Sequence, residues 1–378
     1  MSDQRPESRI AAPLWELPPS KWDPDSDDTL VCCHVRQETH DVKSFLFRTR
    51  SPRLFRFRPG QFITLELMID GQPINRCYTI SSAPTRPDTL SITVKRKIGG
   101  TVSNWLHDNL KPGNAIKALG PAGEFSCTLH PAEKYLFLSG GSGVTPLMSM
   151  ARTHYDLGED KDIVFAHSAR SPRDIIFRTE LVAMASGMAH FRTAFVCENP
   201  SADDPWDGHT GYLTLPMLRL ITRDFAHRTV FCCGPEAYMA AVRALLEDAG
   251  FDMTRYHEES FTFGQHQSAA PAVSNAPLTA ADASPADVAA DGGFNIKFTK
   301  SGQTVSCGPN QFILDAARVA GMRLPFSCAK GMCGTCKSKK LSGEVVMTHN
   351  GGIRQREIDA GMILPCCSKP LSDVTLEK

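Results

Sequence analysis

Cysteines cluster near the C-terminal end of this 378-residue chain, where three of them lie within the stretch from Cys328 to Cys336. Two more, Cys366 and Cys367, follow further along. Residues 1–28 lack the apolar segment of a signal peptide, and no apolar run is long enough to cross a membrane, so we expect a cytoplasmic protein without membrane contact. Clustered thiols in a reducing compartment are more often metal ligands than disulfides. A metal held in this way would tie distant parts of the chain together, and it limits the fold more than any other feature.

The spacing of these cysteines indicates the kind of metal site. It follows C-x4-C-x2-C with a distant further cysteine, the plant-type arrangement in which four thiolates hold two bridged irons. Structural zinc usually takes ligands from two short pairs, and the second C-x2-C pair is missing here, which makes zinc the weaker alternative. Gly331 and Gly334 suit such a loop because glycine tolerates positive φ and lets backbone N–H groups approach the sulfurs. We predict a 2Fe–2S cluster held by Cys328, Cys333, Cys336 and Cys366. Cys367 competes with Cys366 as the fourth ligand.

Residues 263–293 divide the chain. They include ten alanines and three prolines and almost no large apolar side chain, a composition that cannot bury a core and predicts a flexible linker. The segment that follows, 294–378, carries twelve Lys and Arg against six Asp and Glu, whereas residues 1–262 carry 29 against 32. The basic excess is typical of solvated surface. It also suggests that the C-terminal unit docks on an acidic surface of the preceding chain or of a partner.

Two units precede the linker, after an N-terminal extension of residues 1–27. Residues 28–131 contain short apolar or alternating runs separated by Pro and Gly, such as SFLFRT, QFITLELMI and LSITVKR, which are typical of an antiparallel β-barrel. Residues 132–262 instead alternate buried strands such as KYLFLSG and TVFCCG with helical segments such as PEAYMAAVRALLEDAG. This succession indicates an α/β domain with a parallel sheet and helices on both faces.

The run RCYTISS in the predicted barrel has the residue types that a flavin site requires. On a strand, Arg76 and Tyr78 share one face and Thr79 lies on the other. A flavin requires a cation for its phosphate, an aromatic surface beside its ring and a hydroxyl near its reactive nitrogen, and these residues can supply one each. On its own, the pattern is also compatible with an ordinary surface strand.

A second phosphate-binding feature follows in VKRKIGGTVSNWL. Lys95 and Arg96 supply positive charge, and a glycine turn then opens a helix whose free N–H groups and dipole attract phosphate. The residues of this turn are Gly100, Thr101, Val102 and Ser103. Two such features in one barrel favour flavin binding over an ordinary surface.

The predicted parallel sheet carries a glycine-rich turn in YLFLSGGSGVTPLMSM, between an apolar strand and a helix with Pro146 near its first position. A nicotinamide nucleotide can bind its pyrophosphate at the N-terminus of this helix. The residues concerned are Gly140, Gly141, Gly143, Val144, Thr145 and Pro146. Further along, another strand ends with Cys233, Gly234 and Pro235 at the carboxyl edge of the sheet, where ligands bind in such folds.

The motifs R-x-Y-T-x-S, G-T-V-S, GGSGVTP, CGP and EESF occur in this order, and on them the chain resembles the ferredoxin–NADP reductase superfamily. Residues 294–378 resemble plant-type ferredoxin domains, which are α+β β-grasp folds. A reductase joined to a ferredoxin resembles the reductase components of Rieske-type oxygenases and the reductases of hybrid cluster protein. The stretches QFITLELMIDGQPINRCYTISS, SGGSGVTPLMSMAR and FDMTRYHEESF most resemble the reductase components of glycine betaine monooxygenases.

This resemblance implies a role for each predicted residue. It places FAD, rather than FMN, on Arg76, Tyr78, Thr79, Lys95, Arg96 and residues 100–103. It places the nicotinamide nucleotide on residues 140–146 and 233–235. Thr79 and Cys233 would act closest to the reacting atoms. Phe261, which could also be a core aromatic at the end of a domain, would cover the flavin ring, and Cys366 would complete the cluster.

The expected function is electron transfer from NADH. Hydride transfer moves two electrons and an iron–sulfur cluster accepts one at a time, so a flavin is needed between them. The resemblance implies NADH, although Arg170 or Arg173 could bind the additional phosphate of NADPH. It also implies a Rieske-type oxygenase as acceptor, one that demethylates glycine betaine or a similar quaternary ammonium compound, and no nucleic-acid partner. Reduction of hybrid cluster protein and a non-enzymatic metal-binding or redox-sensing module are the alternatives.

Overall fold

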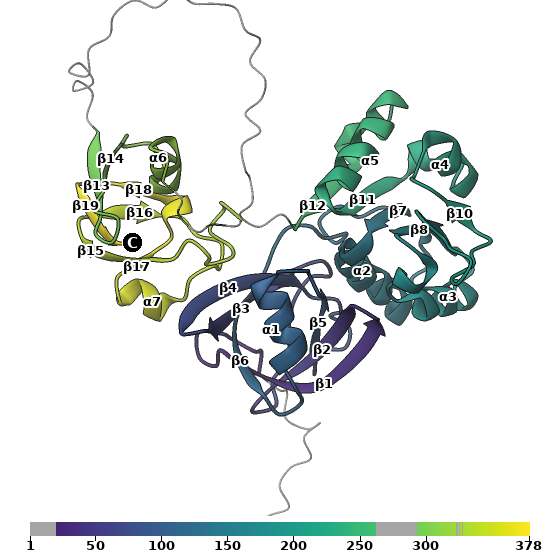
Figure 1. The fold of residues 1–378 in the computed structure, drawn as a ribbon, viewed down its shortest axis with the longest axis horizontal. Helices are drawn as coiled ribbons and strands as arrows, with labels where there is room; N and C mark the ends of the chain where they lie inside the picture. The colour runs from purple at the N-terminus through teal and green to yellow at the C-terminus, as the bar shows by residue number, and fades with distance from the viewer. Residues whose placement is uncertain (1–19, 262–292, 323, 325, 327) are drawn as a thin grey trace, which may run out of the picture.

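The computed structural model describes residues 20–261, 293–322, 324, 326 and 328–378, so the predicted linker lies almost entirely outside the described residues. Three folded units follow one another along the chain: a barrel, an α/β unit and a C-terminal ferredoxin unit (Figure 1). The barrel lies between the other two. In the part of the chain that is described, no helix has the length and apolar character needed to cross a membrane.

The barrel is a sheet of antiparallel strands in the order β4-β3-β6-β1-β2-β5. A bridge between Ile80 and Ile92 joins the end of β4 to β5 and closes the sheet. The strands are β1 (Thr29–Thr39), β2 (Val42–Thr49), β3 (Phe62–Ile69), β4 (Gln72–Thr79), β5 (Leu90–Lys95) and β6 (Ala115–Ala122), and one helix, α1 (Thr101–Asn109), follows β5.

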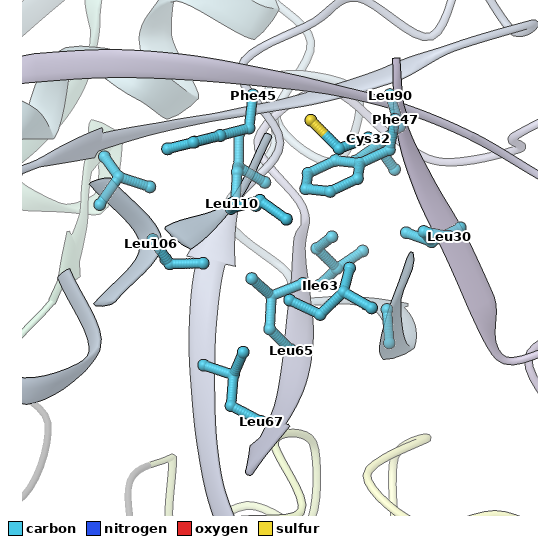
Figure 2. Close-up of a cluster of buried hydrophobic side chains, with 14 of the residues drawn as sticks. Leu30, Cys32, Phe45, Phe47, Ile63, Leu65, Leu67, Leu90, Leu106 and Leu110 are labelled. Carbon is cyan, nitrogen blue, oxygen red and sulfur yellow. The ribbon is translucent and has the colours of Figure 1, made fainter. Parts of the chain in front are cut away.

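Large apolar side chains fill the centre of the barrel (Figure 2). Phe45 and Phe47 from β2 meet Ile63 and Leu65 from β3, and Leu106 from α1 packs against them; all five are fully buried. Each such side chain contributes about 1.5–3 kcal/mol when it is removed from water. The alternation of apolar and polar residues along the strands therefore decides which face of each strand points inward.

The α/β unit is built on a parallel sheet in the order β10-β9-β8-β7-β11-β12. Its strands are β7 (Lys134–Gly140), β8 (Asp162–Ala169), β9 (Phe191–Cys197), β10 (His209–Thr210), β11 (Thr229–Gly234) and β12 (Tyr256–Ser260). Its helices are α2 (Val144–Leu157), α3 (Arg178–Gly187), α4 (Leu215–Ile221) and α5 (Glu236–Asp248). Gly250, just after α5, has φ 70°, the left-handed conformation that glycine provides at helix ends.

The central strand β7 shows why helices cover both faces of this sheet. Tyr135 and Phe137 point to the side of α2 and α3, whereas Leu136 and Leu138 point to the side of α4 and α5. A strand that is apolar on both faces must be covered on both. The predicted fold class, with a parallel sheet between two helical layers, is confirmed.

The ferredoxin unit combines a mixed sheet in the order β14-β13-β19-β15-β17 with the two-stranded sheet β16-β18. The strands are β13 (Phe294–Phe298), β14 (Thr304–Cys307), β15 (Ser338–Ser342), β16 (Val345–Met347), β17 (Met362–Ile363), β18 (Ser368–Pro370) and β19 (Val374–Glu377). Its helices are α6 (Ile313–Val319) and α7 (Gln355–Asp359). The cysteine-rich loop, which carries Cys328, Cys333 and Cys336, lies between α6 and β15.

Candidate functional site

One large cavity reaches residues of all three units. Its volume is about 1680 Å³, and it is lined by Thr79 from the barrel, by Thr145 and Glu259 from the α/β unit, and by Cys328 and Met332 from the cysteine-rich loop. Sites for drug-sized ligands usually measure about 300–1,000 Å³, so this cavity can hold more than one cofactor. Cofactors bound along one such space could lie close enough together for electron transfer.

The end of β4 forms one wall of the cavity. Arg76, Tyr78 and Thr79 all line it, as the sequence predicted for a flavin site. Thr79 is only 7% exposed, and burial raises the pKa of Tyr78 well above its usual value, so its hydroxyl stays protonated. This wall therefore offers a cation, an aromatic ring and a hydroxyl at neighbouring positions, the set that would suit the phosphate and ring of a flavin.

The two predicted cations that follow β4 also line the cavity, and each already has a carboxylate partner. Lys95 Nζ lies 3.0 Å from Asp41 Oδ2. Burial disfavours the charge of Asp41, but the hydrogen bond and charge of Lys95 outweigh it and hold the pKa of Asp41 below its usual value. The Arg96 guanidinium donates two hydrogen bonds to the Asp108 carboxylate. A bound phosphate would therefore share these cations with the protein's own acids.

The N-terminus of α1 faces the cavity as predicted. Gly100, which is the residue before the helix, and the first helical residues Thr101, Val102 and Ser103 all line it. The space at Gly100 is tight, because a Cβ there would lie 2.8 Å from Ser103 Oγ. Ser103 Oγ accepts a hydrogen bond from Lys97 N–H at 3.1 Å and so holds the turn. The free N–H groups of this helix can hold a phosphate without a side chain in between.

The glycine turn after β7 is packed directly against the end of β11. A 3₁₀ turn spans Gly141–Gly143, α2 then begins at Val144, and the proline predicted near the first position is the third residue of the helix. A Cβ on Gly143 would lie 2.1 Å from the carbonyl oxygen of Cys233, so only glycine fits there. A Cβ on Gly140 would lie 3.1 Å from Pro235. The two predicted nucleotide-binding segments thus form one junction.

Only part of this junction opens into the cavity. Of the residues predicted to bind the nicotinamide nucleotide, Thr145 lines the cavity. The others are not among its lining residues: Gly140, Gly141, Gly143, Val144, Pro146, Cys233, Gly234 and Pro235. Cys233 is fully buried, and burial raises the pKa of its thiol, which is therefore neutral. Of the two arginines considered for NADPH, Arg170 lines the cavity, whereas Arg173 lies 3.9 Å from Asp204.

Phe261 follows β12 and lines the cavity. It is half-buried and packs against an apolar cluster that includes Phe125 and Val144. Its position is compatible with both interpretations of the sequence, and its role beside a flavin stays a prediction.

Glu259 also lines the cavity, and the sequence analysis did not identify it. One of its carboxylate oxygens is buried without a hydrogen-bond partner among the described residues, and burial raises the pKa of this group to about 8. Its neighbour Glu258 also lines the cavity but pairs with Arg243. On β12, Glu259 is the register partner of Cys233 on β11. A protonated carboxyl group beside that thiol can donate a hydrogen bond to a bound ligand.

The four predicted cluster ligands come together at the cavity's other end. Cys366 Sγ lies 3.3 Å from Cys336 Sγ and within hydrogen-bond distance of Cys328, and Cys328 contacts Cys333. Cys367 instead directs its Sγ to the carbonyl oxygen of Leu364 at 3.6 Å. Four convergent thiols fit a 2Fe–2S cluster. The choice of Cys366 over Cys367 stays a prediction that this geometry favours.

Backbone N–H groups point at the sulfur of one predicted cluster ligand, Cys328. Lys330 and Met332 donate to Cys328 Sγ at 3.4 and 3.2 Å. Gly331 and Gly334 have φ of 68° and 69°, and a Cβ on Gly334 would lie 2.5 Å from the carbonyl oxygen of Gly352. The loop is thus shaped to surround thiolates with N–H donors, which stabilises their charge.

Comparison with known families accounts for each unit. Residues 31–127 match the oxidoreductase FAD-binding domain family, residues 137–244 the oxidoreductase NAD-binding domain family, and residues 296–371 the 2Fe-2S iron-sulfur cluster binding domain family. The three matches follow the same order as the barrel, the α/β unit and the ferredoxin unit. The predicted cofactor types, FAD, a nicotinamide nucleotide and a 2Fe–2S cluster, are confirmed at the level of these families.

Relatives share this arrangement over nearly the whole chain. The chain is 48% identical over 346 residues to the glycine betaine monooxygenase reductase subunit of Pseudomonas aeruginosa strain UCBPP-PA14, covering 92% of this chain and 94% of that one. It is 45% identical over 352 residues to the stachydrine N-demethylase reductase subunit of Rhizobium meliloti strain 1021, covering 93% and 96%. Phthalate dioxygenase reductase, described as a modular structure for electron transfer from pyridine nucleotides to [2Fe-2S], has the same fold with a TM-score of 0.55 at 23% identity, covering 94% of this chain and 100% of that one.

The predicted resemblance is therefore confirmed by both sequence and fold. The chain belongs to the family of oxygenase reductase subunits that join FAD-binding and NAD-binding oxidoreductase domains to a 2Fe–2S domain.

Proposed function

We propose that this protein is a cytoplasmic reductase that takes electrons from NADH and delivers them to a Rieske-type oxygenase acting on glycine betaine. The observation that carries the proposal is the single cavity that reaches from Thr145 and Glu259, past Thr79, to Cys328. The identity of 48% to a glycine betaine monooxygenase reductase subunit supports the acceptor and its substrate.

Different residues around the cavity would bind the different cofactors. When bound, FAD would supply the link between a two-electron hydride donor and a cluster that accepts one electron at a time. Arg76, Tyr78 and the N-terminus of α1 would hold the flavin, and the Thr79 hydroxyl would face its reactive nitrogen. The Gly141–Gly143 turn would hold the nicotinamide nucleotide, with Cys233 and Phe261 beside the reacting ring.

The proposed domain limits are 28–131 for the FAD unit, 132–262 for the nucleotide unit and 294–378 for the ferredoxin unit. The family matches fall inside these limits, and the closed barrel, the parallel sheet and the mixed sheet do so as well. Limited proteolysis should cut first within residues 263–293, and mass spectrometry would locate the cut. A first cut inside one of the three sheets would contradict these limits.

Anaerobic spectroscopy tests the electron route. NADH should bleach first the flavin bands and then the iron–sulfur absorption of the purified protein, and NADH should be oxidised faster than NADPH at equal concentration. Absence of iron and acid-labile sulfide, or bleaching of the flavin alone, would contradict the route through the cluster.

Reconstitution tests the acceptor. Mixed with the Rieske-type oxygenase of the same organism, the protein should support oxygen-dependent release of formaldehyde from glycine betaine. Stachydrine is the second candidate substrate, because a relative at 45% identity is a stachydrine N-demethylase reductase subunit. Formaldehyde from stachydrine and not from glycine betaine would assign that substrate and leave the reductase function in place.

A further inference from the structure

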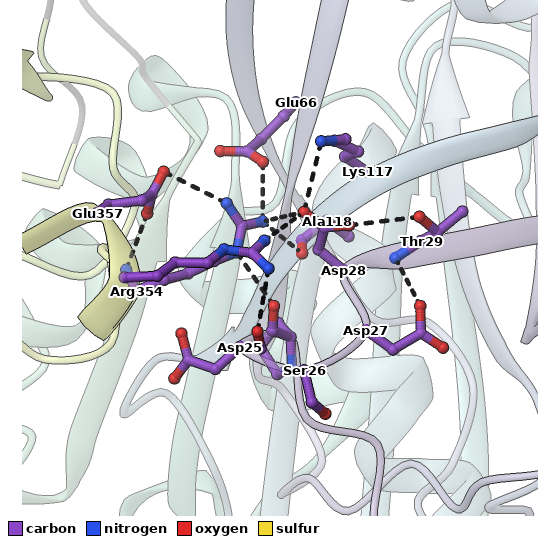
Figure 3. A network of polar contacts seen from close by, with 12 residues as sticks. Asp25, Ser26, Asp27, Asp28, Thr29, Glu66, Lys117, Ala118, Arg354 and Glu357 are labelled. Carbon is purple, nitrogen blue, oxygen red and sulfur yellow. Dashed lines mark hydrogen bonds and ion pairs between the residues drawn. The ribbon is translucent and has the colours of Figure 1, made fainter. Parts of the chain in front are cut away.

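The ferredoxin unit meets the barrel through a compact group of charged residues (Figure 3). Arg354, just before α7, reaches from the ferredoxin unit to Glu66 on β3, and Arg356 reaches to Asp28 at the start of the barrel. Lys337, which follows the ligand Cys336, also lies 3.3 Å from Glu66. The basic C-terminal unit thus places three of its cations on two acids of the barrel.

Arg354 is the most enclosed member of this group. Only 4% of its side chain is exposed, and its guanidinium donates to Glu66 Oε2 at 2.8 Å, to the Ala118 carbonyl at 3.1 Å and to the Pro24 carbonyl at 3.2 Å. These three acceptors belong to the barrel or to the segment that leads into it. Arg354 therefore sits in a polar socket that the barrel provides.

The side chain of Arg354 contributes little to its own unit. The cap of α7 uses the backbone, since Arg354 N–H donates to Glu357 Oε2 at 2.8 Å. The guanidinium contacts Glu357 only at 3.4 Å, and Glu357 has a closer partner in Lys337 at 2.6 Å. Shortening the Arg354 side chain therefore removes contacts between units while the helix cap remains.

Next to this group of charged residues, the ferredoxin unit also contacts the barrel through the cysteine-rich loop. Phe62, Cys77 and Ala122 of the barrel form one small apolar cluster with Cys333, and the Cys77 and Cys333 side chains are in hydrogen-bond contact. The Asn75 side chain also donates to the Gly334 carbonyl at 3.4 Å. Cys77 lies between Arg76 and Tyr78 on the strand that forms the flavin wall. A cluster ligand is thus in contact with the proposed flavin-binding strand.

We propose that Arg354 is a positioning residue that seats the ferredoxin unit on the barrel and so holds Cys333 against Cys77 for electron transfer. The proposal rests on the proposed electron route and adds the residue that sets its geometry. Electron transfer slows steeply as the distance between two cofactors grows, so a unit that is loosely seated receives electrons slowly even when both cofactors are intact. Arg354 does not touch the reacting groups itself.

Removal of a buried charge partner should shift the ferredoxin unit out of its seat. In Arg354→Gln, Glu66 keeps Lys337 at 3.3 Å from its Oε1, but its Oε2 loses the guanidinium, and the Ala118 and Pro24 carbonyls lose a charged donor; such losses in an enclosed site are unfavourable. A smaller docked population lowers every rate that depends on docking. We expect Arg354→Gln to slow flavin-to-cluster electron transfer by on the order of tenfold. The rate at which NADH reduces the flavin should stay the same, because the α/β unit and its contact with the barrel are unchanged.

The test compares holoproteins by anaerobic stopped-flow absorbance, with the flavin and cluster bands followed separately. The matched control is Arg318→Gln, which makes the same change on the exposed face of α6 in the same unit, where Arg318 is 48% exposed. A second readout is zero-length carbodiimide cross-linking between Lys337 and Glu66, quantified by peptide mass spectrometry. The cross-link should fall in Arg354→Gln and persist in Arg318→Gln.

The outcomes separate this inference from the proposed function. If wild-type protein passes electrons from NADH to the cluster and Arg354→Gln does so at the same rate with the same cross-link, the inference is wrong and the function stands. If the wild type itself reduces no cluster, the proposed function fails. Should Arg354→Gln lose its cluster, Glu66→Gln changes only the barrel side, and a wild-type transfer rate in that variant would overturn the inference.

Discussion

The barrel meets its two neighbours through very different surfaces. Toward the α/β unit it contributes Val42, Phe125 and Cys127 to the same apolar core as the sheet residues, and Phe125 packs edge-on against Phe231 at a ring separation of 5.3 Å. Toward the ferredoxin unit it offers one small apolar cluster and the acidic residues Asp28 and Glu66. The first surface is a core shared by two units, and the second is a docking surface.

The difference fits what each pair of units must do. Flavin and nicotinamide must meet in one fixed geometry, which a shared apolar core provides. An ionic contact can separate at lower cost in water, because each charge regains its hydration. A unit that must also reach an external acceptor is better held by charges than by a core.

Loss of the cluster should have the largest effect and should show that the ferredoxin unit can fail without affecting the other two units. Cys336→Ser removes one of the four predicted thiolate ligands, so iron and acid-labile sulfide should be lost and electron transfer beyond the flavin abolished. The flavin content and the rate of flavin reduction by NADH should remain close to wild type. Cys307→Ser, which changes a buried cysteine away from the cluster, is the control and should keep its iron. Loss of flavin in Cys336→Ser would contradict the idea of separable units.

Truncation of a side chain in the shared core should have a smaller effect than loss of the cluster, but it should destabilise two units together. Phe125→Ala removes a large side chain that is only 8% exposed, and such changes cost about 3–5 kcal/mol. Urea unfolding followed by flavin fluorescence and by near-UV circular dichroism should show both units destabilised. If only the barrel is destabilised, the shared core is weaker than its packing indicates.

Acid should lower the free energy of unfolding of the α/β unit by somewhat less than the truncation of Phe125. His167 on β8 is fully buried, with its Nδ1 2.7 Å from Ser139 Oγ, and burial lowers its pKa to about 4, with a smaller contribution from Lys95. An unfolded histidine titrates near 6.5, so the unfolded state binds more protons between pH 6.5 and 4, and stability falls as the pH is lowered through that range. The full effect is about 3 kcal/mol. In His167→Asn this part of the pH dependence should disappear, and an unchanged slope would show that other groups cause it.

Salt should produce the smallest effect, which we expect at the docking surface. Raising ionic strength from about 0.01 M to about 1 M shortens the screening length from about 30 Å to about 3 Å. We expect the rate of cluster reduction to fall by roughly twofold to fivefold, because Arg356 and Lys337 are more accessible to ions than Arg354. Glu66→Gln should show a weaker salt dependence. A rate that is independent of salt in the wild type would argue that apolar contacts dominate this surface.

Much of the fold could be predicted because its strands carry strong apolar patterns. The run KYLFLSG predicts β7 to the residue, and the cysteine spacing predicts which thiols converge. The sequence analysis missed β1, an eleven-residue strand whose polar residues alternate irregularly around a bulge between Cys32 and His34. Its partners on both sides, rather than its own pattern, make it a strand.

The site was predicted where a motif is local and missed where it depends on strand pairing. Arg76, Tyr78 and Thr79 lie together in the sequence, so their shared wall could be foreseen. Nothing in the pair Glu258 and Glu259 shows that Glu258 pairs with Arg243 while one carboxylate oxygen of Glu259 is buried without a partner among the described residues, because the pairing of β12 with β11 and the position of α5 decide it. Similarly, the basic excess of the C-terminal unit suggested docking, but only the assembled structure shows which charges are buried.

The cavity wall formed by Cys328 and Met332 has one further consequence. Because this part of the wall belongs to the unit that docks through charges, undocking would uncover the edge of the proposed flavin site to solvent and dissolved oxygen. The docked ferredoxin unit would then protect the flavin site from oxygen as well as receive its electrons. A protein whose ferredoxin unit is poorly docked should lose electrons to oxygen, with formation of peroxide, before they reach an acceptor.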